Sequence, residues 1–271
     1  MTETAYFLPL GDERLFAFLH LPDGPCRGGA VLCAPLAEEK LWSHRVFVSF
    51  ARELCGLGYA VLRFDYRGEG DSDRQFEQSD LNTRIEDTVA AIDELKRRVP
   101  ELQKVTVVGL RLGAAIAALA AAGRQDAERL VLWDPVINGA EYMQTVLRAN
   151  LMFQMAQHRK VIENREALVE RLDRGETINI EGYELAAPFF RQVSAIQLAE
   201  ALAASPAACQ IVSITSRTAP VRDDIAALGI RYPQASIACA VEEPFWREIK
   251  VFYQRAADLF RVTFDWLGGV A

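Results

Sequence analysis

The segment from Val105 to Ala122 constrains the fold of this chain more than any other part of the sequence. An apolar run that begins at Val105 is followed by Gly109 and Gly113, and then by an alanine-rich stretch. This order predicts a buried strand, a sharp turn and a buried helix. Arg111 occupies the middle of the turn, so a permanent positive charge stands at its tip.

Similar strand and helix patterns precede and follow this segment. Short apolar runs, typical of strands that are buried on both faces of a sheet, alternate with stretches of helical periodicity. The expected strands are Gly29–Ala34, Tyr59–Asp65, Leu130–Trp133, Cys209–Thr215 and Ala235–Cys239, and the expected helices span residues 43–57, 80–99 and 245–267. An antiparallel pair, Tyr6–Leu8 and Leu15–Leu19, is expected to open the chain. We therefore predict an α/β fold with a mostly parallel central sheet and helices on both faces.

The pattern changes between Gly139 and Ala204, where helical periodicity dominates and no long strand-like run occurs. We interpret this part as a helical cap inserted over the C-terminal edge of the sheet. The predicted division is residues 1–138 and 205–271 for the two parts of the core and residues 139–204 for the cap. Met143, Phe153 and Met155 suit either the apolar roof of a cavity or the packing of the cap onto the core.

Composition and charge exclude several classes of function. The net charge is −7 and no basic run occurs, which argues against nucleic acid as a partner. Five widely spaced cysteines without a C-x-x-C pair indicate neither a metal site nor a disulfide framework, and no cofactor is expected. We find no signal-peptide pattern at the N-terminus and no apolar run long enough to insert into a membrane, so a cytoplasmic location is expected.

Four stretches carry a resemblance to a known family. They are Pro35–Glu39, Arg63–Ser72, Gly109–Gly113 and Leu132–Val136. Together they resemble the α/β-hydrolase superfamily over nearly the whole chain, and more closely the exosortase A system-associated hydrolases whose turn reads G-L-R-L-G. The resemblance implies an α/β-hydrolase fold, a lidded pocket and a link to acyl or polysaccharide metabolism.

The usual chemistry of this fold requires a serine in a G-x-S-x-G turn, followed along the chain by an acid and a histidine. Arg111 stands at the serine position, and a guanidinium that stays protonated cannot act as a nucleophile. The histidine is expected near Val241–Pro244 and the acid within Ser216–Pro220, and neither stretch contains the required residue. The sequence therefore predicts that serine-dependent hydrolysis is absent.

Two interpretations of Arg111 remain open. In the first, Arg111 and the helix N-terminus at Leu112 bind a small anionic or acyl-type ligand under the cap. The candidate ligand-binding residues are Arg111, Leu112, Leu36, Glu39 and Trp246. In the second, Arg111 forms an internal ion pair with Asp134, Glu38 or Glu39, because an unpaired buried charge is costly.

Other functions are also consistent with the sequence. One is an enzyme with a different mechanism, acting on an acyl ester or thioester such as acyl-CoA or a substrate on an acyl carrier protein. Its candidate catalytic residues are Arg111, His44, Glu38 and Asp134, with His44 as a general base that starts a helix after the N-cap Ser43. Another is an interaction protein with a vestigial pocket.

For four further polar residues, the sequence favours structural roles over catalytic ones. His20 is expected at a strand end and His158 at the surface, Cys33 as a buried thiol, and Ser72 as a turn residue that satisfies local backbone groups.

Overall fold

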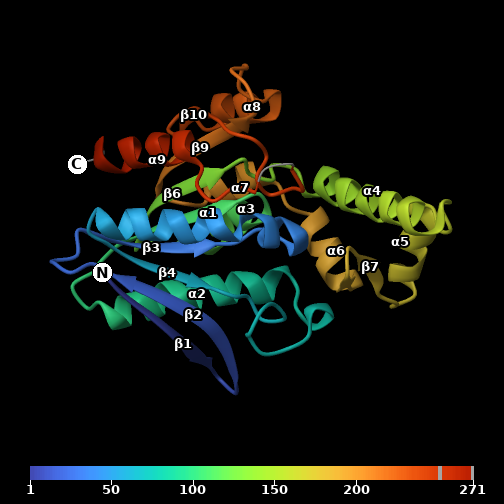
Figure 1. The fold of residues 1–271 in the computed structure, drawn as a ribbon, viewed down its shortest axis with the longest axis horizontal. Helices are drawn as coiled ribbons and strands as arrows, with labels where there is room; N and C mark the ends of the chain where they lie inside the picture. The colour runs from blue at the N-terminus through green and yellow to red at the C-terminus, as the bar shows by residue number, and fades with distance from the viewer. Residues whose placement is uncertain (250–251, 270–271) are drawn as a thin grey trace.

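An eight-stranded sheet forms the centre of the computed structural model, which describes residues 1–249 and 252–269 (Figure 1). Its strand order is β1-β2-β4-β3-β5-β6-β9-β10, and all neighbours from β4 to β10 are parallel. The strands are β1 (Thr2–Leu10), β2 (Glu13–Leu21), β3 (Gly28–Cys33), β4 (Tyr59–Phe64), β5 (Val105–Leu110), β6 (Ala127–Trp133), β9 (Ala208–Thr215) and β10 (Ser236–Val241). The antiparallel opening pair and the α/β fold class are confirmed.

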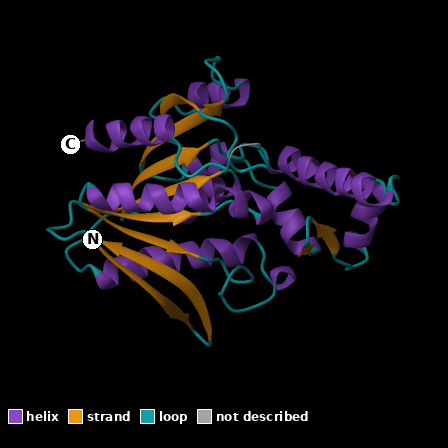
Figure 2. Ribbon diagram, viewed as in Figure 1, coloured by secondary structure: helices purple, strands orange, loops and turns teal. Residues whose placement is uncertain are grey.

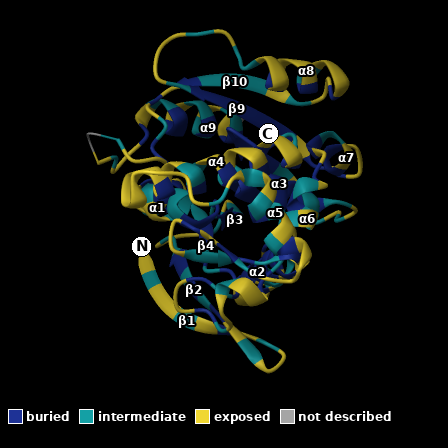
Figure 3. Cartoon of the chain, turned by 90° about the vertical axis from the view of Figure 1, so that its right-hand side faces the viewer, coloured by how far each residue is buried: buried dark blue, intermediate teal, exposed yellow. Residues whose placement is uncertain are grey.

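Helices cover both faces of this sheet (Figure 2). The helices of the core are α1 (Ala37–Gly56), α2 (Leu81–Arg98), α3 (Leu112–Ala121), α8 (Asp223–Arg231) and α9 (Ala257–Gly269). One apolar core includes Phe50 of α1 and Phe260 of α9, and the other includes Ile92 of α2 and Ile116 of α3. All six residues of β5 are buried, as expected for a central parallel strand between two helical layers. Strand β9 is likewise mostly buried (Figure 3).

Helix α1 begins seven residues earlier than predicted. Leu36 is its N-cap residue and Ala37 its first residue, whereas Ser43 lies inside the helix. The Ser43 hydroxyl donates to the backbone oxygen of Glu39 at 2.7 Å, so it bonds to the preceding turn instead of capping the helix. The prediction of an N-cap at Ser43 was wrong, because the acidic first turn with Glu38 and Glu39 starts the helix without a side-chain cap.

The last helix begins later than predicted. Phe245 and Trp246 lie in a loop and are buried, and α9 begins only at Ala257. The carboxylate of Glu242 accepts a hydrogen bond from the backbone N–H of Asp258 at 2.7 Å, which satisfies one of the free amides at the start of α9. The predicted helix from Phe245 was wrong because tertiary burial of the two aromatic side chains holds this stretch in a loop; residues 250–251 lie outside the described part.

The segment between β6 and β9 is mostly helical, as predicted, and its helices α4, α5 and α6 lie to the right of the sheet in Figure 1. It contains α4 (Gly139–His158), α5 (Arg165–Asp173), α6 (Ala187–Ser194) and α7 (Leu198–Ala203), with the short hairpin β7 (Ile178–Ile180) and β8 (Tyr183–Leu185). Three-residue strands are too short to leave a periodic pattern, so the hairpin was not predicted. Met143 is buried, but Phe153 and Met155 are exposed and roof no cavity.

The five cysteines are unpaired in the structure. In the described part of the chain, none of the helices has both the length and the apolar character that crossing a membrane requires.

His20 is fully buried in β2 between two charged side chains. Its Nε2 accepts a hydrogen bond from Nε of Arg63 at 3.2 Å, and its Nδ1 lies 3.1 Å from a carboxylate oxygen of Glu3. Burial lowers the pKa of His20 to about 4, the Arg63 cation acts in the same direction, and Glu3 opposes both. The neutral imidazole is therefore part of the folded state.

We expect this histidine to make the stability of the protein depend on pH. The pKa in the folded chain lies below the ordinary value of 6.5, so the unfolded chain binds more protons between these two values. The free energy of unfolding is expected to be highest above pH 6.5 and to fall as the pH is lowered towards 4. At about 1.4 kcal/mol for each pKa unit, the loss is at most about 3 kcal/mol.

Urea unfolding of the wild type and of His20→Gln across this pH range checks the expectation. The variant should show a flatter dependence on pH than the wild type. Equal slopes in the two proteins would contradict it.

Candidate functional site

The turn between β5 and α3 holds Arg111 in a backbone conformation that L-residues rarely adopt, with φ 54° and ψ −120°. The turn requires glycine on both sides. A Cβ at Gly109 would lie 2.3 Å from the backbone oxygen of Gly113, and a Cβ at Gly113 would lie 2.3 Å from that of Cys33. The N–H of Arg111 donates to the carbonyl of Trp133 at 3.0 Å, which ties the turn to the end of β6.

The guanidinium of Arg111 is bound by two carboxylates. Its Nη1 lies 2.9 Å from Oδ2 of Asp134 and 3.2 Å from the backbone oxygen of the same residue, and its Nε lies 3.3 Å from Oε1 of Glu39. Only 12% of the Arg111 side chain is exposed. The two carboxylates raise the pKa of Arg111 although burial opposes this, so the guanidinium is charged and paired.

Asp134 links Arg111 to a second arginine. It follows the end of β6 at φ 41°, and its Oδ2 also lies 2.8 Å from Nη1 of Arg222. Its Oδ1 accepts the backbone N–H of Ile214 in β9 at 3.3 Å. Arg222 in turn contacts Asp224 at 2.6 Å. A chain of alternating charges therefore crosses the C-terminal ends of β5, β6 and β9.

Glu39 links Arg111 to the inserted segment. Its Oε2 accepts the hydroxyl of Tyr142, a residue of α4, at 3.1 Å. Burial raises the pKa of Glu39 and that of Tyr142, and Arg111 opposes both shifts. The Tyr142 ring also lies 5.8 Å from the Arg111 guanidinium, and the Trp246 ring lies 5.5 Å from it. Two aromatic faces thus flank the cation at cation–π distance.

A pocket of about 410 Å³ opens in front of Arg111 at the C-terminal edge of the sheet. In open α/β sheets, ligands bind beyond the C-terminal ends of the strands. Its lining includes Arg111, Asp134, Tyr142, Arg222, Trp246 and Arg247. Arg247 is exposed in the loop after β10, and within the described residues no carboxylate forms an ion pair with it.

The structure brings together only some of the predicted site residues. Asp134, Glu39 and Trp246 surround Arg111. Leu36 and Leu112 are buried beside the turn and do not line the pocket. Tyr142, Arg222 and Arg247 were missed, because no local pattern marks a residue whose role depends on a distant partner.

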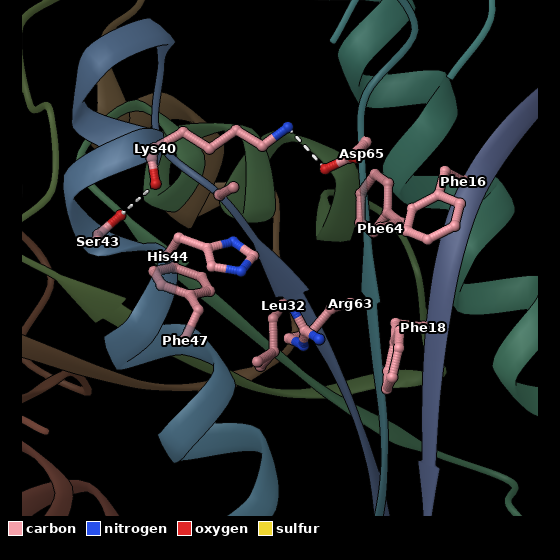
Figure 4. Close-up of a pocket in the computed structure, with 11 residues that line it drawn as sticks. Phe16, Phe18, Leu32, Lys40, Ser43, His44, Phe47, Arg63, Phe64 and Asp65 are labelled. Atoms are coloured by element: carbon pink, nitrogen blue, oxygen red, sulfur yellow. Dashed lines mark hydrogen bonds and ion pairs between the residues drawn. The ribbon is translucent and has the colours of Figure 1, made fainter. Parts of the chain in front are cut away.

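His44 and Glu38 do not line the pocket in front of Arg111, and the catalytic roles predicted for them stay predictions. Because α1 begins at Ala37, His44 lies in the second turn of that helix and lines a different cavity (Figure 4). Burial raises the pKa of Glu181 in the β7–β8 hairpin, and the charges of Glu38 and Glu39 add to this effect.

Three residues have the structural roles that were predicted for them. The Ser72 hydroxyl donates to the carbonyl of Asp65 at 2.6 Å and accepts the N–H of Phe16 at 2.8 Å. Burial raises the pKa of the Cys33 thiol to about 12, which keeps it protonated. His158 is exposed at the end of α4.

Comparison with known proteins agrees with the observed fold. The family described as serine aminopeptidase, S33, matches residues 41–176, which is half of the chain. The chain belongs to this family of α/β-hydrolases. None of the curated proteins matches the sequence.

Solved structures with the same fold include several enzymes. Est1E from Butyrivibrio proteoclasticus with bound ferulic acid has a TM-score of 0.73 and 17% identity, covering 98% of each chain. DcsB in complex with its substrate analogue has a TM-score of 0.65 and 13% identity, covering 100% of each. The thioesterase domain from the curacin biosynthetic pathway has a TM-score of 0.55 and 17% identity, covering 90% of this chain and 95% of that one. At these identities the likeness shows the fold.

The ion pairs of Asp134 and Asp224 predict different losses in the free energy of unfolding when each carboxylate is removed. Asp134→Asn keeps the size of the side chain and tolerates the positive φ, but leaves Arg111 with one carboxylate. Removing one partner of a buried ion pair is expected to lower the free energy of unfolding by about 3 kcal/mol. Asp224→Asn removes an exposed partner of Arg222 and is expected to cost less than about 1 kcal/mol.

Urea denaturation of both variants measures this difference. Equal losses in the two variants would show that the Arg111–Asp134 pair does not have the stabilising role assigned to it.

Proposed function

We propose that this protein binds a small carboxylate or acyl-type ligand at the Arg111 pocket and does not hydrolyse it through a serine. The observation that carries the proposal is the state of Arg111. The residue at the tip of the turn is a charged guanidinium that two carboxylates hold in place. It can neither attack a carbonyl nor leave the position where a nucleophile would stand.

The remaining hydrogen-bonding capacity of the pocket favours an anion. The contacts with Glu39 and Asp134 use Nε and Nη1 of Arg111, which leaves Nη2 for a further acceptor. Arg247 lines the same pocket. A carboxylate between these two groups would receive charge-assisted hydrogen bonds, and the Trp246 ring offers a flat apolar face beside it.

The proposal also assigns the chain to a narrower group within the α/β-hydrolases. The G-L-R-L-G turn of residues 109–113 supports a place among the exosortase A system-associated hydrolases in which arginine replaces serine. The thioesterase neighbour supports acyl-CoA or an acyl carrier protein as the source of the acyl group. The unpaired cysteines support a cytoplasmic location.

The alternative of an enzyme that uses His44, Glu38 and Arg111 together receives less support. His44 lines a separate cavity, and Glu38 lines neither that cavity nor the Arg111 pocket. A general base must come within hydrogen-bond reach of the proton it removes.

The first test concerns serine chemistry. We expect no covalent adduct by mass spectrometry after treatment with a fluorophosphonate probe, and no turnover of a panel of nitrophenyl esters. A stoichiometric adduct on any serine would overturn the proposal.

The second test concerns binding. Ferulate and acetyl-CoA are used as probes in a thermal-shift titration, because a ligand that binds only the folded state raises the melting temperature. We expect a shift with at least one probe and its loss in Arg247→Gln. Arg217→Gln, which removes an exposed arginine outside the pocket lining, is the matched control and should keep the shift.

If neither probe shifts the melting temperature, or if both variants respond as the wild type does, the binding proposal fails. An interaction protein with a vestigial pocket would then be the remaining interpretation.

A further inference from the structure

A second cavity lies between α1 and the strands β2, β3 and β4, apart from the Arg111 pocket (Figure 4). Its volume is about 260 Å³. Its walls are four phenylalanines, one leucine and one alanine, together with five polar residues. The lining residues are Phe16, Phe18, Leu32, Ala34, Lys40, Ser43, His44, Phe47, Arg63, Phe64 and Asp65. An apolar cavity with a few convergent polar groups is the usual form of a small-molecule site.

Arg63 is the unusual member of this lining. Its Nε donates to His20, and its guanidinium lies 5.0 Å from the ring of Phe18. Within the described part of the chain, no carboxylate forms an ion pair with it, and both Nη nitrogens are left without a protein acceptor. Burial lowers the pKa of Arg63. By contrast, the buried Arg84 and Arg111 each bind a carboxylate.

The other charges in the cavity balance one another. Lys40 contacts Asp65 at 2.7 Å and Glu69 at 3.0 Å, so these groups do not offer a free charge to a ligand. Burial lowers the pKa of His44, which leaves a neutral imidazole that can donate one hydrogen bond. The cavity therefore has one positive charge that no ion pair within the described residues holds, at Arg63, although Asp65 and Glu3 act on it from a longer distance.

The aromatic walls indicate what surrounds that charge. Phe16 and Phe18 project from β2 on one side, and Phe47 projects from α1 beside His44 on the other (Figure 4). Three rings on two facing elements suit a flat apolar group, because aromatic pairs add specific stabilisation to the burial of apolar area. A single cation matches a monoanion better than a phosphate, which would carry a second charge.

We propose that this cavity is a second binding site, which takes an aromatic monocarboxylate with its carboxylate on the Nη nitrogens of Arg63 and its ring among Phe16, Phe18 and Phe47. The site is independent of the Arg111 pocket. The two sites use neighbouring residues of α1, since Glu39 binds Arg111 whereas Lys40 binds Asp65 and Glu69.

Isothermal titration with 2-naphthoate tests the site, with 2-naphthamide as a neutral ligand of the same shape. Hydrogen bonds to a charged group contribute about 1.5 to 3 kcal/mol, which corresponds to roughly a tenfold to hundredfold change in Kd. We expect 2-naphthoate to bind the wild type tighter than 2-naphthamide by this factor. In Arg63→Gln the two ligands are expected to bind with equal, weak affinity.

A second variant keeps the test valid if Arg63→Gln is unstable. His44→Trp places an indole at an exposed lining position and should block the cavity while Arg63 stays in place. Arg45→Trp puts the same side chain on the neighbouring exposed residue, outside the lining, and should bind 2-naphthoate as the wild type does.

The proposal is overturned if 2-naphthoate does not bind the wild type, or if His44→Trp binds it unchanged. It is also overturned if binding is lost in Arg247→Gln and kept in Arg63→Gln, since the ligand would then occupy the Arg111 pocket. Failure at the Arg63 cavity leaves the ferulate and acetyl-CoA results unaffected, so the two proposals are tested separately.

Discussion

The ion pairs of Arg111 with Glu39 and Asp134 organise the carboxyl edge of the sheet. Arg111 sits at a strained turn that only two flanking glycines permit, and its partners come from the first turn of α1 and the end of β6. Glu39 extends the network to Tyr142 in the inserted segment, and Asp134 extends it to Arg222 before α8. Because a buried charge without a partner is costly, each of these segments has to meet the others at this point.

This network lies at the position where the α/β-hydrolase fold usually holds its nucleophile. The strand, turn and helix still place one side chain at the tip of the turn, as in a nucleophile elbow. The side chain there is a cation that forms ion pairs with two carboxylates. A pocket opens in front of this ion-pair network. The proposed binding without covalent chemistry relies on the same geometry that would otherwise position a nucleophile.

The two cavities differ in how their charges are balanced. At the Arg111 pocket, Arg111 and Arg222 each share Asp134, and further carboxylates complete their neutralisation. In the cavity beside α1, Lys40 forms ion pairs, whereas Arg63 contacts an imidazole and an aromatic ring and forms no ion pair within the described residues. The first pocket is therefore polar and held by protein partners, whereas the second is aromatic and offers one unmatched cation to a ligand.

The sequence by itself determined the α/β class, most strands and the turn at Arg111, because apolar periodicity and glycine spacing are local signals. It also placed Asp134 and one of Glu38 and Glu39 near Arg111, since the C-terminal ends of parallel strands share one edge. Only the tertiary structure decided that both carboxylates bind Arg111, that Tyr142 and Arg222 complete the network, and that His44 faces another cavity. The start of α1 and the loop at Phe245 likewise depend on contacts between distant residues, which no local pattern encodes.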